Sequence, residues 1–409
     1  MQDRNLITLD EALARLVAGA ARLRILEAET VSSFEALGRV LAADLHSQID
    51  VPPRDNTAMD GYALRAADVP AAGTRLPVSQ RIPAGVVGEP LVPGSAARIF
   101  TGGQLPEGAD AVVMQEQCEA VPGDGLGEVV VNQVPAAGQW VRRRGEDVLR
   151  GHTVLRLGTR LTPQALGMAA TVGAETLAVW RRPRVALFST GDELVLPGQP
   201  LPPGAIYNSN RHTLRALLQA AGCEVQDLGI VPDRLDATRA ALRQAAEASD
   251  LILTSGGVSV GEEDHLKPAV QAEGELQSWQ VAMKPGKPLA FGRVGKSLVM
   301  GLPGNPVSSY ITFLLTVAPV LRTLQGMDAT PPRPLLLRAD FDWPRPDRRR
   351  EFMRARLNEQ GGLELFPNQS SGVLTSTVWA DGLIDNPAGQ AVKRGDMVRF
   401  LPLDTLVWR

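Results

Sequence analysis

A glycine-rich turn and an acidic cluster share one short stretch of the sequence, TSGGVSVGEEDHLKP at residues 254–268. Its first part, with Ser255, Gly256 and Gly257, follows an apolar run and offers a hydroxyl and backbone N–H groups unobstructed by Cβ atoms, as an anion-binding turn does. Three carboxylates ending at Asp264 follow, and like charges this close destabilise one another unless something neutralises them. The stretch predicts an anion and a cation held together, although a tight turn and an N-cap at Asp264 would use the same residue types.

A second acidic loop, STGDE at residues 189–193, places Asp192 and Glu193 directly after another apolar run. Alone it is typical of a solvated turn. Two such loops favour a hard divalent cation, because Mg²⁺ prefers carboxylate and phosphate oxygens. We expect carboxylates of these two loops to be its ligands. The histidines share no metal-binding spacing, so histidine ligation is not indicated.

Two further stretches carry groups that bind anions. KPGKP sets Lys284 and Lys287 around a stiff Pro-Gly turn, which predicts an anion clamp, or else an exposed basic turn. GLPGNPVSS places Asn305 or Ser308 at the start of a long helix, where free N–H groups meet anions. Structural capping of the helix would need the same residues.

These loops are positioned by apolar strands that alternate with amphipathic helices between residues 184 and 326. This alternation predicts βαβ units and a parallel sheet with helices on both faces, a doubly wound α/β domain over 181–328. Ligands of such sheets sit at the carboxyl ends of the strands. The loops at 189–193, 254–264 and 301–306 are therefore expected to converge on one edge of the sheet.

The rest of the chain shows two kinds of sequence pattern, one helical and one β-type. Helical spacing over 8–23, 32–45 and 162–174 predicts a discontinuous helical linker domain, 1–45 and 147–180. Short β-type runs between Gly and Pro residues predict an inserted β domain over 46–146. Short alternating runs over 329–409 predict a C-terminal β-barrel domain.

Composition excludes several classes of function. The 409 residues are 44% hydrophobic with a net charge of −3, so no basic field indicates nucleic acid or an anionic membrane as partner. The two cysteines, Cys118 and Cys223, indicate neither a disulfide framework nor a cysteine metal site, and a reducing cytoplasm fits. No signal peptide is indicated. The apolar stretch 310–321 contains Pro319 and is short for a membrane span, so we expect a buried core helix.

In their order along the chain, the motifs resemble one family, the molybdopterin molybdenumtransferases or MoeA family, related to the E domain of gephyrin. The resemblance rests on NTAMDGYA, FTGG, GADAVV, VRRRGED, STGDEL, SNR, TSGGVSVGEED, KPGKP and GLPGNPVS. It implies the final step of molybdenum cofactor synthesis, in which molybdate is inserted into adenylylated molybdopterin with Mg²⁺-dependent release of AMP. It also implies an elongated homodimer with the active cleft between subunits, supplied with substrate by a molybdopterin adenylyltransferase.

The resemblance also implies roles for individual residues. The catalytic set would be Asp60, Glu193, Asp233 and Asp264, with Asp60 coming from the partner's β domain. Glu193 and Asp264 would be the Mg²⁺ ligands. The substrate-binding set would be Thr101, Arg142, Asp147, Ser255, Gly256, Gly257, Lys284, Lys287, Asn305, Arg350 and Ser371, the last two reaching in from the barrel. The sequence departs from the family at Gln280, where relatives carry a lysine.

Two other functions share parts of this pattern. The adenylyltransferase that makes the activated pterin has the same α/β fold, but its loop resembles TGGTG followed by Arg-Asp, whereas SGGVSVGEED stands here. A gephyrin-like scaffold would bind a peptide near the barrel. Molybdate and tungstate have nearly the same shape and charge, so the sequence does not distinguish between these two oxyanions.

Overall fold

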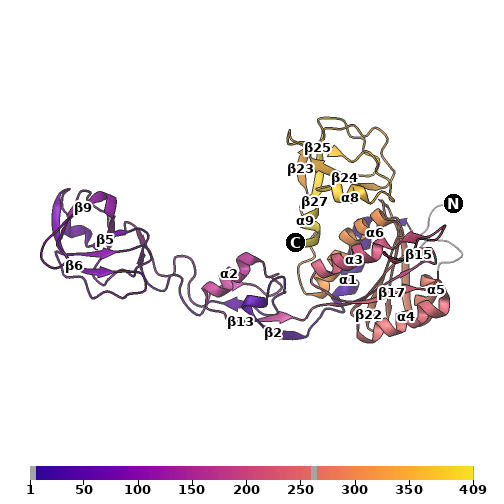
Figure 1. The fold of residues 1–409 in the computed structure, drawn as a ribbon, viewed down its shortest axis with the longest axis horizontal. Coiled ribbons are helices and arrows are strands. Elements are labelled where there is room, and N and C mark those ends of the chain that lie inside the picture. The colour runs from indigo at the N-terminus through magenta and orange to yellow at the C-terminus, as the bar shows by residue number, and fades with distance from the viewer. Residues whose placement is uncertain (1–5, 259–264, 409) are drawn as a thin grey trace.

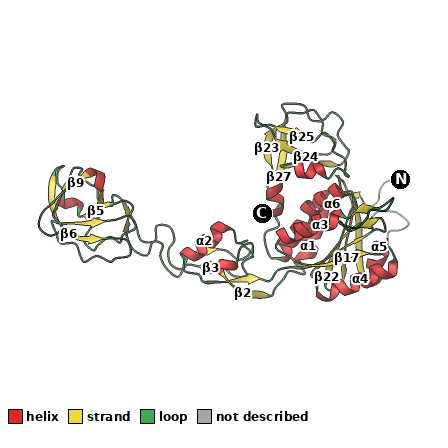
Figure 2. Cartoon of the chain, in the orientation of Figure 1, coloured by secondary structure: helices red, strands yellow, loops and turns green. Residues whose placement is uncertain are grey.

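The computed structural model describes residues 6–258 and 265–408, and these form an elongated molecule with the β-rich insertion at one end and the α/β unit at the other (Figure 1). The predicted ligand Asp264 lies outside the described residues. The mixed α/β and strand-rich fold expected from the sequence is confirmed. Figure 2 shows that helices concentrate in the α/β unit.

The α/β unit is built on a seven-stranded sheet in the order β1-β19-β21-β22-β18-β14-β17. Neighbouring strands from β22 to β17 are parallel, while β21 is antiparallel to both of its neighbours. The strands are β1 (Leu6–Ile7), β14 (Arg184–Thr190), β17 (Glu224–Val231), β18 (Leu251–Ser255), β19 (Gly274–Val281), β21 (Pro288–Val294) and β22 (Ser297–Leu302).

Both faces of this sheet are buried under helices. On β14, Val185 and Leu187 belong to one apolar cluster, and Ala186 and Phe188 belong to another, because successive side chains of a strand point to opposite faces. The first cluster includes residues of α1 (Leu9–Ala21), α3 (Ser209–Ala220), α6 (Pro306–Thr312) and α7 (Ala318–Leu324). The second includes residues of α4 (Leu235–Ala248) and α5 (Leu266–Glu273).

The first helix lies elsewhere than we predicted. Thr8 and Glu11 form a capping box that starts α1, as their spacing predicts. However, Leu9 and Leu16 are buried in the core of the α/β unit, where α1 packs on α7, so the helix is not part of the linker domain. The apolar face of α1 is buried against the α/β core. The spacing of its apolar residues predicts a helix but does not tell which core the helix packs against.

The apolar stretch around Pro319 lies within one continuous helical segment, Pro306–Leu324. It has the length and apolarity of a membrane span, but 94% of the tested window is buried inside the protein, which confirms a core helix. A π-helical turn, Phe313–Val317, separates α6 from α7. This local rearrangement accommodates Pro319, which has no N–H to donate to the preceding turn.

The linker is mostly extended chain, and the helix predicted over 32–45 is wrong. Only a 3₁₀ turn, Ser33–Glu35, forms there, and Phe34 and Leu37 are exposed, so the helically spaced residues have no core to pack on. Instead, β2 (Ala28–Ser32) pairs with β13 (Thr176–Trp180), and β3 (Leu45–His46) pairs with β12 (Thr153–Leu155). Helix α2 (Pro163–Thr171) forms as predicted.

The insertion has its own sheet, in the order β8-β5-β7-β6-β10-β9. Its strands are β5 (Gly61–Leu64), β6 (Thr74–Ile82), β7 (Ala96–Ile99), β8 (Ala111–Met114), β9 (Cys118–Val121) and β10 (Glu128–Val131), with 3₁₀ turns at Ala66–Asp68 and Gln115–Gln117. A separate two-stranded ladder joins β4 (Asn56–Thr57) to β11 (Val141–Arg142).

The strands of the C-terminal unit pair in a ring. The order is β20-β24-β26-β27-β23, with β25 beside β24, and a bridge between Ala339 and Leu363 joins the end of β23 to β25. The elements are β20 (Met283–Lys284), β23 (Leu335–Arg338), β24 (Arg350–Leu357), β25 (Leu363–Leu365), β26 (Gly382–Asn386), β27 (Met397–Pro402), α8 (Thr375–Trp379) and α9 (Leu403–Trp408). Because β20 belongs to the α/β segment of the chain, this ladder attaches the two units.

Candidate active site

Three loops meet at the carboxyl edge of the parallel strands, as predicted. Ser189 is paired in register with Ser255, and Ser255 with Leu302, so β14, β18 and β22 end at one level. The loops that follow line a cleft of about 640 Å³, together with residues of the C-terminal unit. Its lining includes Gly191, Glu193, Asp233, Gly256, Gly257, Lys284, Lys287, Asn305, Ser308, Arg349 and Ser371.

The glycine turn is required by geometry, but it is only partly available to an anion. A Cβ on Gly256 would lie 2.7 Å from the backbone oxygen of Thr190, and its φ of +92° is unfavourable for other residues. Its N–H donates to the carbonyl of Leu302, and the Ser255 hydroxyl contacts that of Ser189. The Gly256 N–H is therefore not a spare donor, and Ser255 lines a neighbouring cavity rather than the cleft.

The acidic side of the cleft is formed by Glu193 and Asp233. The carboxylate of Glu193 folds over Gly191, where a Cβ would come within 2.6 Å of it, so only glycine permits this position. Asp192 points elsewhere and accepts a hydrogen bond from the Asp233 N–H. Within 6–258 and 265–408 there is no group of three or more His, Cys, Asp or Glu side chains that could hold a metal ion.

The opposite wall of the cleft is cationic. The Lys284 ammonium lies 3.2 Å from Glu351 and 3.4 Å from Asp347, both in the C-terminal unit. Glu351 is buried and also accepts from the Trp343 indole at 2.9 Å. Arg349 binds both oxygens of Asp347 and holds the pKa of that carboxyl well below its usual range. Lys284 and Arg349 are thus oriented by carboxylates behind them, so their positions do not depend on a ligand.

The segment around residue 370 also lines the cleft. Ser371 lines the cleft, and its carbonyl accepts from the N–H of Val307 at the start of α6. Arg354, which is 1% exposed, donates to the carbonyl of Ser370, and the amide of Gln369 bonds to the Arg354 backbone. These bonds fix the segment against β24.

The alternative reading of Asn305 as a structural cap is not supported. Asn305 stands at the N-cap position of α6, but its side chain makes no capping hydrogen bond. It lines the cleft instead, beside Ser308. An uncommitted amide at a helix N-terminus is available to an anion.

Family models match almost the whole chain. The MoeA N-terminal region (domain I and II) matches residues 7–173, the "Probable molybdopterin binding domain" matches 186–323, and the MoeA C-terminal region (domain IV) matches 337–403. The chain is 39% identical to the molybdopterin molybdenumtransferase of Haemophilus influenzae, over 88% of this chain and 89% of the relative. This chain belongs to the MoeA family. It is therefore an enzyme of the molybdopterin molybdenumtransferase type.

Other relatives agree with this family membership. The Bacillus subtilis molybdopterin molybdenumtransferase is 36% identical over 95% of this chain and 92% of its own. The crystal structure of the molybdopterin biosynthesis MoeA protein from Pyrococcus horikoshii OT3 matches with a TM-score of 0.81 and 31% identity, covering 97% of this chain and 99% of that one. The MoeA fold thus extends over all units of the chain.

In this MoeA-family chain, four of the predicted site residues lie in or beside the insertion, at the far end of the molecule from the cleft (Figure 1). Asp60 accepts from the backbone N–H and the hydroxyl of Thr101, both at 2.7 Å, which lowers the pKa of Asp60. Arg142 and Asp147 are exposed. Within one chain, these residues do not reach the α/β cleft.

The arginine run beside them divides into structural and uncommitted members. Arg143 binds Asp55 at 2.8 Å, and Arg144 binds Asp50 at 2.5 Å. Arg142 has no ion pair within the described part of the chain, which leaves its guanidinium available. The side chains of Arg143 and Arg144 remain 56% exposed in these ion pairs.

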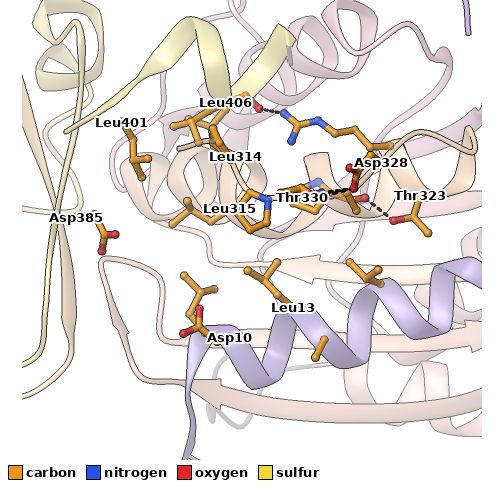
Figure 3. A pocket seen from close by; sticks show the side chains of 18 of the residues that line it. Asp10, Leu13, Leu314, Leu315, Thr323, Asp328, Thr330, Asp385, Leu401 and Leu406 are labelled. Carbon is orange, nitrogen blue, oxygen red and sulfur yellow. Dashed lines mark hydrogen bonds between the residues drawn. The ribbon is translucent and has the colours of Figure 1, made fainter. Parts of the chain in front are cut away.

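Arg350, predicted to bind substrate, lies outside the cleft of its own chain. Its guanidinium binds the buried carboxylate of Asp385, at 2.8 Å for one N–O pair, and also contacts Asp10 at 3.1 Å. It lines a different cavity, of about 520 Å³, between α1 and the C-terminal unit, in which Figure 3 shows Asp10 and Asp385 on the side of the C-terminal sheet. Its neighbour Arg349 lines the cleft.

Sequence reasoning missed Arg349 and the carboxylates behind it. The run RRREFMR contains all the charges, but nothing in its spacing tells which arginine reaches the cleft. The parallel pairing of Met283 with Arg350 and of Lys284 with Glu351 decides this, and it joins segments far apart in the chain.

Proposed function

We propose that this chain catalyses the final step of molybdenum cofactor synthesis, transferring molybdenum from molybdate to the dithiolene of adenylylated molybdopterin and releasing AMP. The observation that carries the proposal is a single cleft lined both by the carboxylates of Glu193 and Asp233 and by the cationic side chains of Lys284, Lys287 and Arg349. An adenylylated pterin and an oxyanion need both kinds of group. Family membership supports this assignment.

The cationic wall would bind the oxyanion and the phosphate groups. Lys284 and Arg349 are held by Glu351 and Asp347, so little side-chain entropy is lost when an anion binds. Ser371 and Asn305 would add uncharged hydrogen-bond donors. This arrangement would orient the phosphoanhydride and keep molybdate beside it.

The acidic wall fits Mg²⁺. Glu193 would supply hard oxygen donors in the cleft, and Asp264, phosphate oxygens and water would complete the ligand set, as Mg²⁺ prefers. Bound there, Mg²⁺ would neutralise charge on the phosphoanhydride oxygens. We assign Glu193 and Asp264 as ligands and Asp233 as the group that accepts a proton from the attacking oxygen.

We further propose a homodimer in which the insertion of one subunit completes the cleft of the other. Asp60, Thr101, Arg142 and Asp147 carry functional chemistry but lie far from the cleft of their own chain (Figure 1). A second copy would place them against the cleft. Its substrate would come from a molybdopterin adenylyltransferase.

We place the reaction in the cytoplasm. Both cysteines are free, and burial raises the pKa of the Cys118 thiol to about 11 and that of Cys223 to about 12. Neither thiol is a reactive nucleophile at neutral pH.

The direct test is incubation of the purified protein with adenylylated molybdopterin and Mg²⁺, with molybdate, tungstate or neither. We expect oxyanion-dependent release of AMP together with metal-loaded cofactor. Absence of oxyanion-dependent AMP release would overturn the proposal. Formation of adenylylated molybdopterin from ATP and molybdopterin would instead indicate the adenylyltransferase, and failure to restore cofactor synthesis in a deletion strain would indicate a scaffold.

A further inference from the structure

Two neighbouring arginines of the insertion have no part in the reaction proposed above. Arg81 on β6 and Arg98 on β7 are paired in register, so their side chains stand next to each other on one face of the sheet. Tyr62 on β5 is paired with Arg98 from the other side. The three side chains therefore form a row across three neighbouring strands.

This row lies beside Asp60 and Thr101. Asp60 directly precedes β5, and its carboxylate accepts both hydrogen bonds from Thr101. These bonds lower the pKa of Asp60, and the nearby charge of Arg98 adds a smaller effect in the same direction. Asp60 thus influences Arg98 through space, but its hydrogen bonds go to Thr101.

Aromatic rings hold both guanidinium groups. The guanidinium carbon of Arg81 lies 4.6 Å from the centroid of the half-buried Phe100 ring, and that of Arg98 lies 4.7 Å from the same centroid. Arg98 also lies 5.2 Å from the centroid of Tyr62. The ring quadrupole attracts a cation over its face. Stacking uses the flat face of a guanidinium, whereas its N–H donors point outward in the plane.

Neither arginine has an ion pair among the residues that the structure describes. Arg98 donates to the carbonyl of Gly61 at 3.1 Å and to the side-chain oxygen of Gln115 at 2.6 Å, and both acceptors are uncharged. The exposed side chain of Arg81 makes no hydrogen bond to the described residues. By contrast, Arg75 on the same strand lies 3.4 Å from Glu128. Two neighbouring like charges repel each other, and an anion bound to both would relieve this.

We propose that Arg81 and Arg98 form a binding site for a tetrahedral oxyanion on the insertion, beside Asp60 and Thr101. Guanidinium groups bind the oxygens of such anions through paired N–H donors, and one dianion would neutralise both charges. Two sources have this chemistry, molybdate and the phosphate of the nucleotide. The choice between them rests on the proposed function, whereas the site itself does not. In the proposed homodimer, the insertion would present this oxyanion to the partner's cleft.

The experiment measures how fast phenylglyoxal, which modifies accessible arginines, reacts with Arg81 in the full-length protein. Peptide mass spectrometry follows Arg81 and, as a reference on the same strand, Arg75. Molybdate, AMP or chloride is added at equal ionic strength. We expect molybdate or AMP to slow the modification of Arg81 about tenfold at about ten times its dissociation constant, because only the unbound guanidinium reacts. Arg75 should react at the same rate throughout.

A matched pair of variants tests whether the two arginines act together. Arg98→Gln removes one charged donor group, and we expect about tenfold more oxyanion to be needed to protect Arg81. Arg75→Gln removes the same charge from the same strand and should change this concentration by less than about twofold, because salt screens distant charges. Thermal unfolding checks that both variants fold, and the wild-type measurement decides the proposal if Arg98→Gln does not.

The outcomes are separable. Protection of Arg81 by molybdate, by AMP or by both supports the inference and identifies the oxyanion. If neither protects Arg81 more than chloride does, if Arg75 is protected equally, or if a folded Arg98→Gln protein keeps wild-type protection, the inference is wrong. Molybdate-dependent AMP release from adenylylated molybdopterin is measured in parallel. Its absence while Arg81 is protected would overturn the proposed function and leave the oxyanion site standing.

Discussion

At the scale of the residue, the site combines side chains whose neighbours fix them in advance. Lys284 is held by Glu351 and Asp347, and Arg349 by Asp347. Pre-positioned charges stabilise developing charge without reorganisation during the reaction. Each wall of the cleft therefore has its own testable role.

The acidic wall is tested by Glu193→Gln and Asp233→Asn. Each removes a negative charge from the cleft while keeping size, and we expect AMP release to fall by about 10²–10³. Glu247→Gln, on the exposed face of α4, is the control and should leave activity unchanged. Steady-state AMP release at several Mg²⁺ concentrations measures the effect. Wild-type rates in both cleft variants would remove these residues from the mechanism.

The carboxylate behind the cationic wall is tested by comparing Glu351→Ala with Glu351→Gln. Alanine leaves the Trp343 indole and the Asp347 N–H without their acceptor, and we expect a loss of about 2–3 kcal/mol in the free energy of unfolding. Glutamine keeps an acceptor oxygen and should lose about 1 kcal/mol. Chemical denaturation measures both. Equal losses of unfolding free energy in the two variants would show that these hydrogen bonds do not account for the contribution of Glu351 to stability.

At the scale of the element, strand ends and turns decide where functional groups stand. The turn after β18 passes so close to β14 that Gly256 has no room for a side chain. In the C-terminal unit, Asp340 follows β23, and its N–H donates to Leu363, where the ring of strands closes.

The Gly256 turn is tested by Gly256→Ala, with Gly229→Ala as the matched control. Both residues have positive φ, but a Cβ on Gly229 meets nothing within 4 Å, whereas on Gly256 it meets the Thr190 oxygen. We expect Gly229→Ala to cost about 1 kcal/mol and Gly256→Ala about 1–3 kcal/mol more, with weaker substrate binding. Thermal unfolding and KM measure this. Equal behaviour would show that the turn relaxes freely.

The closure of the C-terminal strands should be sensitive to acid. Arg338 and Asn358 bind Asp340 and lower its pKa from 3.8 to about 2. Because the folded-state pKa is depressed, the carboxylate stabilises the fold above pH 4, and this contribution is lost as the pH falls from about 4 to about 2. Asp340→Asn should remove that part of the acid dependence, as measured by urea unfolding between pH 2 and pH 6. An unchanged pH profile would contradict the assignment.

At the scale of the whole molecule, the extended linker separates two sets of proposed site residues. Asp60 and Thr101 lie in the insertion, and Glu193 lies at the opposite end (Figure 1). This separation supports a shared site between subunits, and it makes the assembly testable by mixing inactive variants.

Asp60→Asn and Glu193→Gln should each be inactive as homodimers. After dissociation and reassociation in equal amounts, half of the dimers would be mixed, and each of these would have one intact site, so activity should recover to about a quarter of wild type. AMP release before and after mixing measures this. A mixture that stays inactive while mixed dimers form would contradict a site shared in this way.

The sequence by itself determined the α/β pattern, the turn-rich insertion and the three loops that meet at one sheet edge, because alternation and turn chemistry are local properties. Only the tertiary structure decided which core receives α1, why residues 32–45 are not a helix, and that Arg349 rather than Arg350 lines the cleft. It also placed Glu351 behind Lys284. These depend on pairings between segments far apart in the chain, such as β20 with β24, which no local pattern encodes.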